Sequence, residues 1–423
     1  MASISNWPRD RCSSIFFVLD MIVFVINTMT LLLQLILYPQ RAKRLITDPT
    51  KNIFVPLMVL HSATLIIGAS IYARQGINIS ADVIYILFWA YVVFAIIVCF
   101  PMLMIWFNQP HDLTKFSPAW AFLIFPMMLV GVVAYNVLRV MEPTDPRARG
   151  ILITAYIFQG LGFFMTLFYI CIYIIRIMMT GFLEGPQASG AFVACGPPGF
   201  TAISLINLAE ESQPILKSWG VINERAGEVW YATSILAALM LFGLAIFFFA
   251  FGALPFWFKW RRHLSQILSC WALTFPNVGW ILTVRKIGDI FDLNVFKIWY
   301  LVMIVIMCVT WTILFVFTAI AFCRGKIFMT PSEEILRDLT EKEREEDIER
   351  ALYTNGSVAM AIGMNSLAST PLGSTPAFTR PGTPSFTPTP TRVVEGAGVE
   401  VLRPPRRIHP YQHMLTSDLT VHS

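Results

Sequence analysis

Long apolar segments separated by short polar connections occupy most of the chain between Ser14 and Phe322. Each is long enough, and sufficiently free of charge, to cross a bilayer as an α-helix. The segments span residues 14–37, 53–72, 83–107, 119–138, 150–178, 189–209, 229–256, 264–284 and 295–322. The pattern predicts an all-α polytopic membrane protein with about nine transmembrane helices.

The segment at 189–209 is interrupted near its middle by the sequence Gly196-Pro197-Pro198-Gly199. Proline removes a backbone donor and clashes with the preceding turn, so this helix is expected to be kinked or partly unwound at membrane depth. Lipid cannot satisfy the freed carbonyls, and the break must therefore lie against protein or beside a water-filled cavity. Discontinuous helices of this kind often mark a transport site, which makes a solute pathway the working hypothesis.

Interior prolines recur in every second segment. Pro56, Pro126, Pro198 and Pro276 follow one another at intervals of 70, 72 and 78 residues. The spacing predicts helical hairpins in which a proline-kinked inner helix precedes a plainer one, with the inner helices around a central pore. One further interval backward would place another broken helix ahead of Met1, while its plain partner at 14–37 is present. Chance spacing is the alternative, because prolines are common in membrane helices.

The composition agrees with a membrane protein, since 56% of the 423 residues are hydrophobic and only 13% are charged. The net charge is +5. The part of the chain before Arg324 holds 20 of the 31 basic residues and 14 of the 26 acidic ones, so basic residues are in excess there. This excess favours anions around a pathway, or the anchoring of lipid headgroups. The seven cysteines contain no C-x-x-C pair. No catalytic or nucleotide-binding motif is found, and no enzyme activity, metal, cofactor or nucleic acid is expected.

A few side chains near the breaks are candidates for a role in transport. Phe275, just before Pro276, could plug a narrow pathway, although an ordinary packed phenylalanine is the alternative. Hydroxyl and amide groups near the breaks could contact an anion or could form interhelical hydrogen bonds. These residues are Thr201, Ser204, Thr274 and Asn277. His61 could titrate or meet a carboxylate, with a structural role as the alternative, and Asp20 is costly within a span unless it is paired.

Residues beyond the last apolar segment form a different kind of region. A capping box of Thr330 and Glu333, with Pro331 at the first helical position, predicts a charged juxtamembrane helix over 324–353. Residues 354–423 are rich in Gly, Ser, Thr and Pro and are expected to be disordered. At the other end of the chain, a short segment 1–13 precedes the membrane domain 14–323. Threonines that precede proline predict phosphorylation by a kinase. They are Thr370, Thr375, Thr383, Thr387 and Thr389.

Orientation depends on how the basic residues are weighted, because both sides of the predicted bundle carry similar numbers of them. The dense clusters at 41–44 and 259–262 lie on the same side as the C terminus. Weighted as the strongest signals, they predict a cytoplasmic C terminus.

Three stretches resemble the tellurite-resistance/dicarboxylate transporter family, especially its fungal malic acid permease branch. They read FSPAWAFLIFPMMLVG, ASGAFVACGPPGFTAISLI and CWALTFPNVGWILTVRKIG. The resemblance covers about residues 12–324. It implies ten helices in five hairpins, proline-kinked inner helices around an anion pore, often a trimer, and a phenylalanine plug that maps onto Phe275. The inner helix that opens the family's pattern is not found before Ser14.

The expected function is transport of small organic anions, malate or another C4-dicarboxylate, across the plasma membrane without ATP hydrolysis. Sulfite efflux is the alternative within transport. A membrane receptor or scaffold that does not transport is the alternative from another class, as is an inactive truncated paralogue. The truncated gene model is the favoured explanation for the missing inner helix, ahead of a degenerate paralogue and a working nine-helix variant.

Overall fold

The computed structural model describes residues 7–48, 51–220, 223, 225–258 and 268–325. The chain divides into two compact units, Met1–Thr330 and Pro331–Ser423. The second unit lies outside the described residues, and so do nearly all of the predicted juxtamembrane helix, the predicted disordered tail and its five Thr-Pro sites.

The first unit is built from α-helices and short 3-10 segments, and no strand occurs in the part of the chain that the structure describes. The α-helices are α1 (Trp7–Leu37), α2 (Pro39–Thr47), α3 (Leu57–Arg74), α4 (Ala81–Phe107), α5 (Phe125–Leu138), α6 (Pro146–Thr180), α7 (Gly196–Trp219), α8 (Ala226–Phe258), α10 (Phe275–Ile290) and α11 (Asn294–Cys323). Among the described residues, 7 helical stretches are long and apolar enough to cross a membrane. The polytopic all-α class is confirmed, while the count of nine spans stays a prediction.

The predicted proline breaks are sites where a 3-10 segment passes into an α-helix. The 3-10 segments are η1 (Asn52–Phe54), η3 (Pro118–Leu123), η4 (Gly185–Cys195) and η5 (Ser269–Leu273), which precede α3, α5, α7 and α10. Pro56 is the N-cap of α3, and prolines also occupy the first positions of α5, α7 and α10. Proline is tolerated there because the first N–H groups of a helix have no partner within it. The sequence led us to expect kinks inside continuous helices. In the structure, these prolines instead lie where α-helices begin after a 3-10 segment.

Burial separates inner helices from outer ones. In the apolar window of Gln187–Trp219, 94% of the residues are buried, against 6% in the window of α11. The inner helices pack in the order α3, α5, α7 and α10, and each also contacts the helix that follows it in the chain: α4, α6, α8 or α11. The alternation of broken inner and plainer outer helices predicted from the proline spacing is therefore present in the fold.

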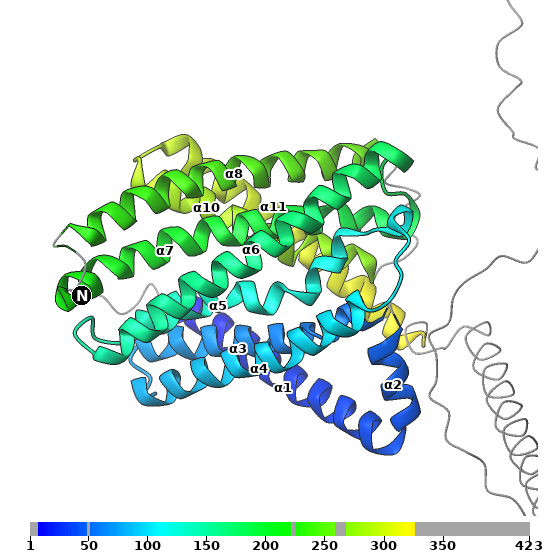
Figure 1. The fold of residues 1–423 in the computed structure, drawn as a ribbon, viewed down its shortest axis with the longest axis horizontal. Coiled ribbons are helices and arrows are strands. Elements are labelled where there is room, and N and C mark those ends of the chain that lie inside the picture. Colours follow the sequence, from blue (N-terminus) through cyan, green and yellow to red (C-terminus); the bar gives the residue numbers. More distant parts are fainter. Residues whose placement is uncertain (1–6, 49–50, 221–222, 224, 259–267, 326–423) are drawn as a thin grey trace, which may run out of the picture. The chain divides into compact units, whose positions relative to one another are not determined.

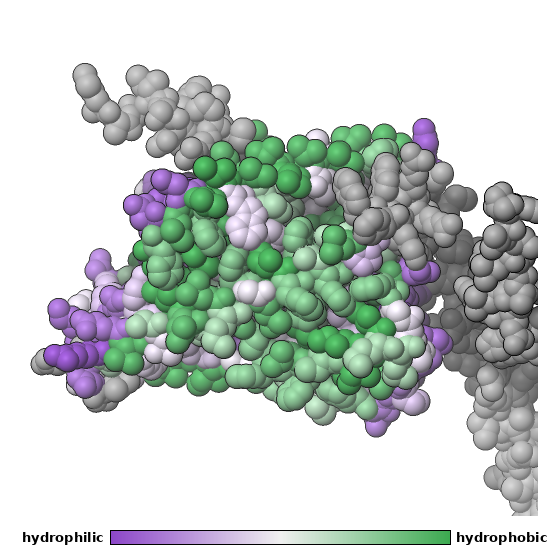
Figure 2. Space-filling model, turned by 90° about the horizontal axis from the view of Figure 1, so that it is seen from above, coloured by the Kyte–Doolittle hydropathy of each residue, from purple (hydrophilic) through white to green (hydrophobic). Residues whose placement is uncertain are grey.

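Figure 1 shows these helices running side by side, with the short helix α2 lying across their direction at one end. Apolar side chains cover the face drawn in Figure 2, and polar residues gather at its two opposite ends. A lipid-facing protein surface has this distribution, because the hydrocarbon region accepts apolar side chains and the headgroup regions accept polar ones.

The helix α1 attaches to the rest of the unit chiefly through one face. Phe17 contacts Tyr72 of α3 at a ring-centroid distance of 5.0 Å, and a Cβ added to Gly68 would lie 2.5 Å from the Phe17 ring. Phe24 contacts His61 edge-on at 5.2 Å. The remaining large apolar side chains of α1 are mostly exposed, as expected for a helix that presents its other faces to lipid.

The breaks in α7 and α10 lie directly against each other. A Cβ added to Gly279 would lie 2.5 Å from the backbone nitrogen of Phe200, and one added to Gly199 would lie 2.6 Å from that of Trp280. Both distances are shorter than side chains allow. The glycines in G-P-P-G-F and F-P-N-V-G therefore permit two helix backbones to approach closely, as small residues do at membrane helix interfaces.

Replacing Gly279 with alanine is expected to destabilise the protein, because the added methyl group forces α7 and α10 apart. Overpacking of this kind costs about 1–3 kcal/mol. Gly243→Ala in α8 is the matched control, since its added Cβ would have nothing within 4 Å. Thermal unfolding in detergent should show a lower midpoint for Gly279→Ala and an unchanged one for the control. Equal midpoints would contradict the close crossing.

Candidate functional site

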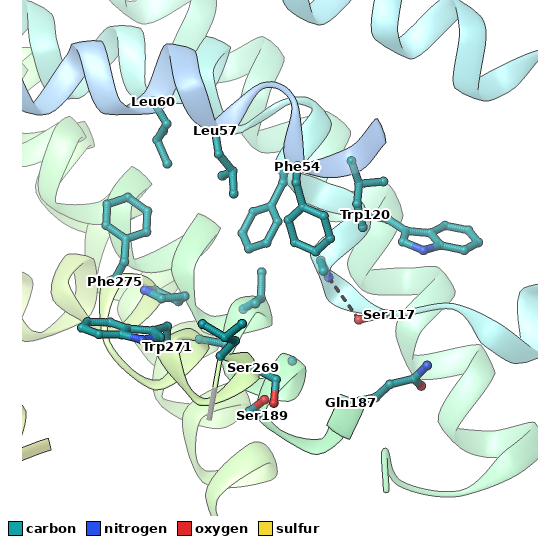
Figure 3. A pocket seen from close by; sticks show the side chains of 18 of the residues that line it. Phe54, Leu57, Leu60, Ser117, Trp120, Gln187, Ser189, Ser269, Trp271 and Phe275 are labelled. Carbon is teal, nitrogen blue, oxygen red and sulfur yellow. Dashed lines mark hydrogen bonds between the residues drawn. The ribbon is translucent and has the colours of Figure 1, made fainter. Parts of the chain in front are cut away.

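A cavity with a volume of about 1140 Å³ lies where the inner helices begin. Its lining comes mainly from the 3-10 segments η1, η3, η4 and η5, from the first turns of α3 and from the loop that follows α4. Figure 3 labels ten of the lining side chains. They are Phe54, Leu57, Leu60, Ser117, Trp120, Gln187, Ser189, Ser269, Trp271 and Phe275. The cavity therefore lies beside the 3-10 segments that precede the inner helices.

Phe275 lines the cavity at the start of α10. Its ring stacks on the ring of Phe200 with centroids 5.0 Å apart and an interplanar angle of 28°. In Figure 3 the ring extends from the start of α10 toward Leu57 and Leu60 of α3. Among the described residues of α10, the lining includes Phe275 and Pro276 and nothing further along the helix. Phe275 therefore lies in the cavity lining, and its role as a plug stays a prediction.

A hydrogen-bonded aspartate and histidine also line the cavity. Asp20 of α1 lies 2.8 Å from Nε2 of His61, and it accepts a hydrogen bond of 2.9 Å from the hydroxyl of Thr64. The side chains of His61 and Asp20 are 18% and 34% exposed. This arrangement supplies both the carboxylate considered for His61 and the partner that Asp20 requires. The sequence indicated each residue separately, but not that they meet.

The loop after α4 brings charged groups to the rim of the cavity. The carboxylate of Asp112 accepts hydrogen bonds from the hydroxyl and the backbone N–H of Thr114, at 2.7 and 3.0 Å. These bonds lower the pKa of Asp112, and Lys115, 3.9 Å away, lowers it further. The carboxylate therefore remains ionised to lower pH than an ordinary aspartate. The Asp112–Lys115 pair leaves the rim with both signs of charge.

Three of the four polar residues expected near the breaks have structural partners, whereas the hydroxyl of Ser204 has none within the described structure. Thr201 accepts a 2.8 Å hydrogen bond from Gln159, and the Thr274 hydroxyl donates to the carbonyl of Trp271 at 2.7 Å. Asn277 donates to the carbonyl of Leu273 at 2.7 Å and accepts from the indole of Trp280 at 2.8 Å. Neither Thr201, Ser204, Thr274 nor Asn277 is among the described residues that line the cavity. Thr201 forms an interhelical hydrogen bond, and Thr274 and Asn277 bind backbone carbonyls beside the helix break.

One cavity-lining hydroxyl was missed by the sequence analysis. Ser189 is 3% exposed, and its Oγ has no hydrogen-bond partner within the described structure. A buried hydroxyl without a partner is unfavourable, and a ligand that accepts its hydrogen bond would remove that cost. Its position at the first residue of the apolar segment 189–209 was visible in the sequence, but its orientation toward the cavity was not.

The remaining predicted site prolines mark the helix starts without all facing the cavity. Pro276 lines it, whereas Pro56, Pro126, Pro197 and Pro198 are absent from the described lining. Pro197 instead lines a much smaller void between η3, α6 and α7. Within the same described part of the chain, no group of three or more His, Cys, Asp or Glu side chains is placed to hold a metal ion.

At the opposite end of the inner helices lies a charged cluster that the sequence analysis also missed. It contains Arg139 of the α5 end, Glu210 and Glu211 of α7, and Lys286 of α10. The sequence placed Arg139 and Lys286 in connecting loops and ended the segment of α7 at Ala209. The helix α7 continues to Trp219, which brings both glutamates into the bundle.

Access to the cavity can be tested by introducing cysteine at one position in η5 and one in α10. Ala272→Cys lies in the cavity lining, whereas Val284→Cys replaces a residue that is 0% exposed. A charged, membrane-impermeant thiol reagent should modify Ala272→Cys when applied on the side of α2, and should leave Val284→Cys at the level of the unsubstituted protein. Mass spectrometry of the labelled proteins measures this. Similar labelling of both variants would contradict a cavity that reaches Ala272 but not Val284.

Comparison with known proteins gives one consistent set of relatives. A family model described as the voltage-dependent anion channel matches residues 2–319. The chain is 28% identical over 317 residues to the malic acid transport protein of Schizosaccharomyces pombe, covering 73% of this chain and 70% of that protein. A second protein of that yeast, also named for malic acid transport, is 26% identical over 308 residues, covering 72% and 71%. No solved structure matches significantly.

Proposed function

Because the chain belongs to the voltage-dependent anion channel family, we propose that it carries malate or another C4-dicarboxylate across the plasma membrane without ATP hydrolysis. Membership confirms the family resemblance seen in the sequence, and the protein is a multi-pass membrane protein of a transport family. The choice of malate follows the names of the two yeast relatives. The observation that carries the proposal is the cavity at the starts of the four broken helices, with Phe275 in its lining.

The cavity would offer an anion a favourable environment even though its rim does not carry more basic than acidic side chains. The 3-10 segments that lead into α5, α7 and α10 line it, and the N-terminus of a helix carries partial positive charge. The hydroxyl of Ser189 has no hydrogen-bond partner within the described structure. Helix ends and hydroxyl groups together would replace part of the hydration of a carboxylate.

In the proposed mechanism, Phe275 restricts passage from the cavity to the opposite side. Its ring is held against Phe200, and movement of the ring away from this stack would open the pathway. Beyond it on the same face of α10 lie Val278 and Leu282, both half-buried. This apolar stretch would keep resident water scarce while Phe275 is closed, which limits leakage of other ions.

Phe275→Ala is expected to raise the rate of malate uptake into proteoliposomes roughly tenfold, equivalent to lowering the barrier by about 1.4 kcal/mol. Phe247→Ala is the matched control, because that ring lies on α8 and is 53% exposed on the outer surface. Uptake of labelled malate and of sulfite should be normalised to the amount of folded protein. Unchanged flux of both anions would contradict the transport proposal, and an increase for sulfite alone would favour sulfite efflux.

The orientation and assembly of the transporter are further parts of this proposal. The short helix α2 carries basic positions Arg41, Lys43 and Arg44, and basic segments favour the cytoplasmic side. The C terminus, the charged helix proposed for 324–353 and the disordered tail would then be cytoplasmic. The resemblance to the family supports a homotrimer.

A cytoplasmic tail would be accessible to a kinase. Phosphate on the Thr-Pro sites would add negative charge to this tail. Phosphopeptide mapping of the protein from its native host should find phosphate on at least one of Thr370, Thr375, Thr383, Thr387 and Thr389. A map that covers all five sites and finds none modified would remove regulation at these residues.

A further inference from the structure

Arg139 connects the end of α5 to two carboxylates of α7. Its Nε lies 3.1 Å from Glu211, and one terminal nitrogen lies 3.2 Å from Glu210. The same nitrogen donates a 2.7 Å hydrogen bond to the side-chain carbonyl of Asn207. One guanidinium group thus holds two neighbouring carboxylates, as its planar set of donors allows.

Lys286 of α10 binds the same cluster from the other side of α7. Its ammonium group lies 2.8 and 2.7 Å from the two carboxylate oxygens of Glu210. Glu210 therefore bridges the two cations, while Glu211 is held by Arg139. Two cations and two carboxylates give this cluster no net charge, although it joins three of the inner helices.

The cluster lies on the faces of α7 and α10 that also carry the Phe275 constriction. On α10, Phe275, Val278, Leu282 and Lys286 follow one another at intervals of three or four residues and share one face. All four are half-buried, which distinguishes this face from the buried positions Thr283 and Val284. The proposed route past Phe275 therefore leads along α10 to Lys286.

On α7 the same spacing connects the constriction to the cluster. Phe200, Ser204, Asn207 and Glu211 lie on one face. Phe200 stacks on Phe275, and both Asn207 and Glu211 contact Arg139. Two independent helices thus place the cluster beyond Phe275, at the opposite mouth of the proposed route.

We propose that Arg139 and Lys286 form a dicarboxylate-binding site at this mouth, and that Glu210 and Glu211 occupy it when no substrate is bound. This inference rests on the proposed transport function and names a second site for its substrate. A dicarboxylate presents two carboxylates on one molecule, matching the two that the cations hold here. Exchange of an internal carboxylate for an external one preserves the number of ion pairs.

Partial exposure makes such an exchange feasible. The side chains of Arg139, Glu210, Glu211 and Lys286 are between 20% and 30% exposed. Water and a dissolved anion can therefore reach them, and a released glutamate can become hydrated. Ion pairs with such access to water are individually weak, so they can yield to a substrate carboxylate.

A purely structural clip between helices is the competing explanation, and it predicts a different response to substitution. If the cluster only joins α5, α7 and α10, loss of either sign of charge should weaken the fold. If the glutamates compete with substrate, removing a glutamate charge should strengthen anion binding and removing a lysine charge should weaken it. Opposite changes in malate affinity for the glutamate and lysine variants therefore distinguish competition from a purely structural role.

The test is malate binding to the purified full-length protein in nanodiscs, measured by calorimetry at neutral pH. Glu210→Gln is expected to lower the Kd for malate about three- to fivefold and Lys286→Gln to raise it by a similar factor, since one weak ion pair corresponds to such a factor. Lys286→Arg should largely restore binding. Asp289→Asn is the matched control, because Asp289 pairs with Arg285 at 2.8 Å on an exposed part of α10.

Thermal unfolding of each variant separates binding from folding, and malate flux is measured independently. Opposite changes in Kd with unchanged stability would support the site, even if the wild-type protein transported no malate and the proposed function failed. Equal Kd values for Glu210→Gln, Lys286→Gln and the wild-type protein, changes in the same direction, or no malate binding at all would overturn it, even if malate flux were normal.

Discussion

The structure depends on how the backbone N–H and carbonyl groups at the helix breaks find hydrogen-bond partners in a medium that offers none. Within lipid, an unpaired backbone carbonyl or N–H costs several kcal/mol, so a helix can break only where protein or water supplies a partner. Here each break is a short 3-10 segment that maintains local hydrogen bonds and passes into an α-helix begun by proline. The outer helices cover these breaks and present apolar side chains outward.

Close packing of the breaks against one another follows from the same constraint. Gly199 and Gly279 allow α7 and α10 to meet backbone to backbone, and Asn277 satisfies a carbonyl within the break while it holds the Trp280 indole. The region is therefore rigid where its polar groups are paired. The cavity opens on the other side of these helix starts, with Ser189 as a hydroxyl still without a partner in the described structure.

Charge is confined to the two ends of the proposed route, apart from the Asp20–His61 pair beside the cavity. Between the ends, the route passes Phe275, Val278 and Leu282, which are apolar. An anion would therefore meet polar partners before and after the constriction, but not within it. The barrier to passage would then be set by dehydration of the anion and movement of the Phe275 ring. Selectivity among anions would arise at the two mouths of the route.

The sequence by itself determined the membrane class, the alternation of broken and plain helices, the four break positions and the family, because apolar periodicity and proline act locally. It could not determine that Asp20 meets His61, that Ser189 faces the cavity, or that Arg139 and Lys286 share Glu210. These pairs join residues far apart in the chain. Only the packing of helices decides which faces meet, since many arrangements of the same amphipathic segments satisfy the local pattern equally well.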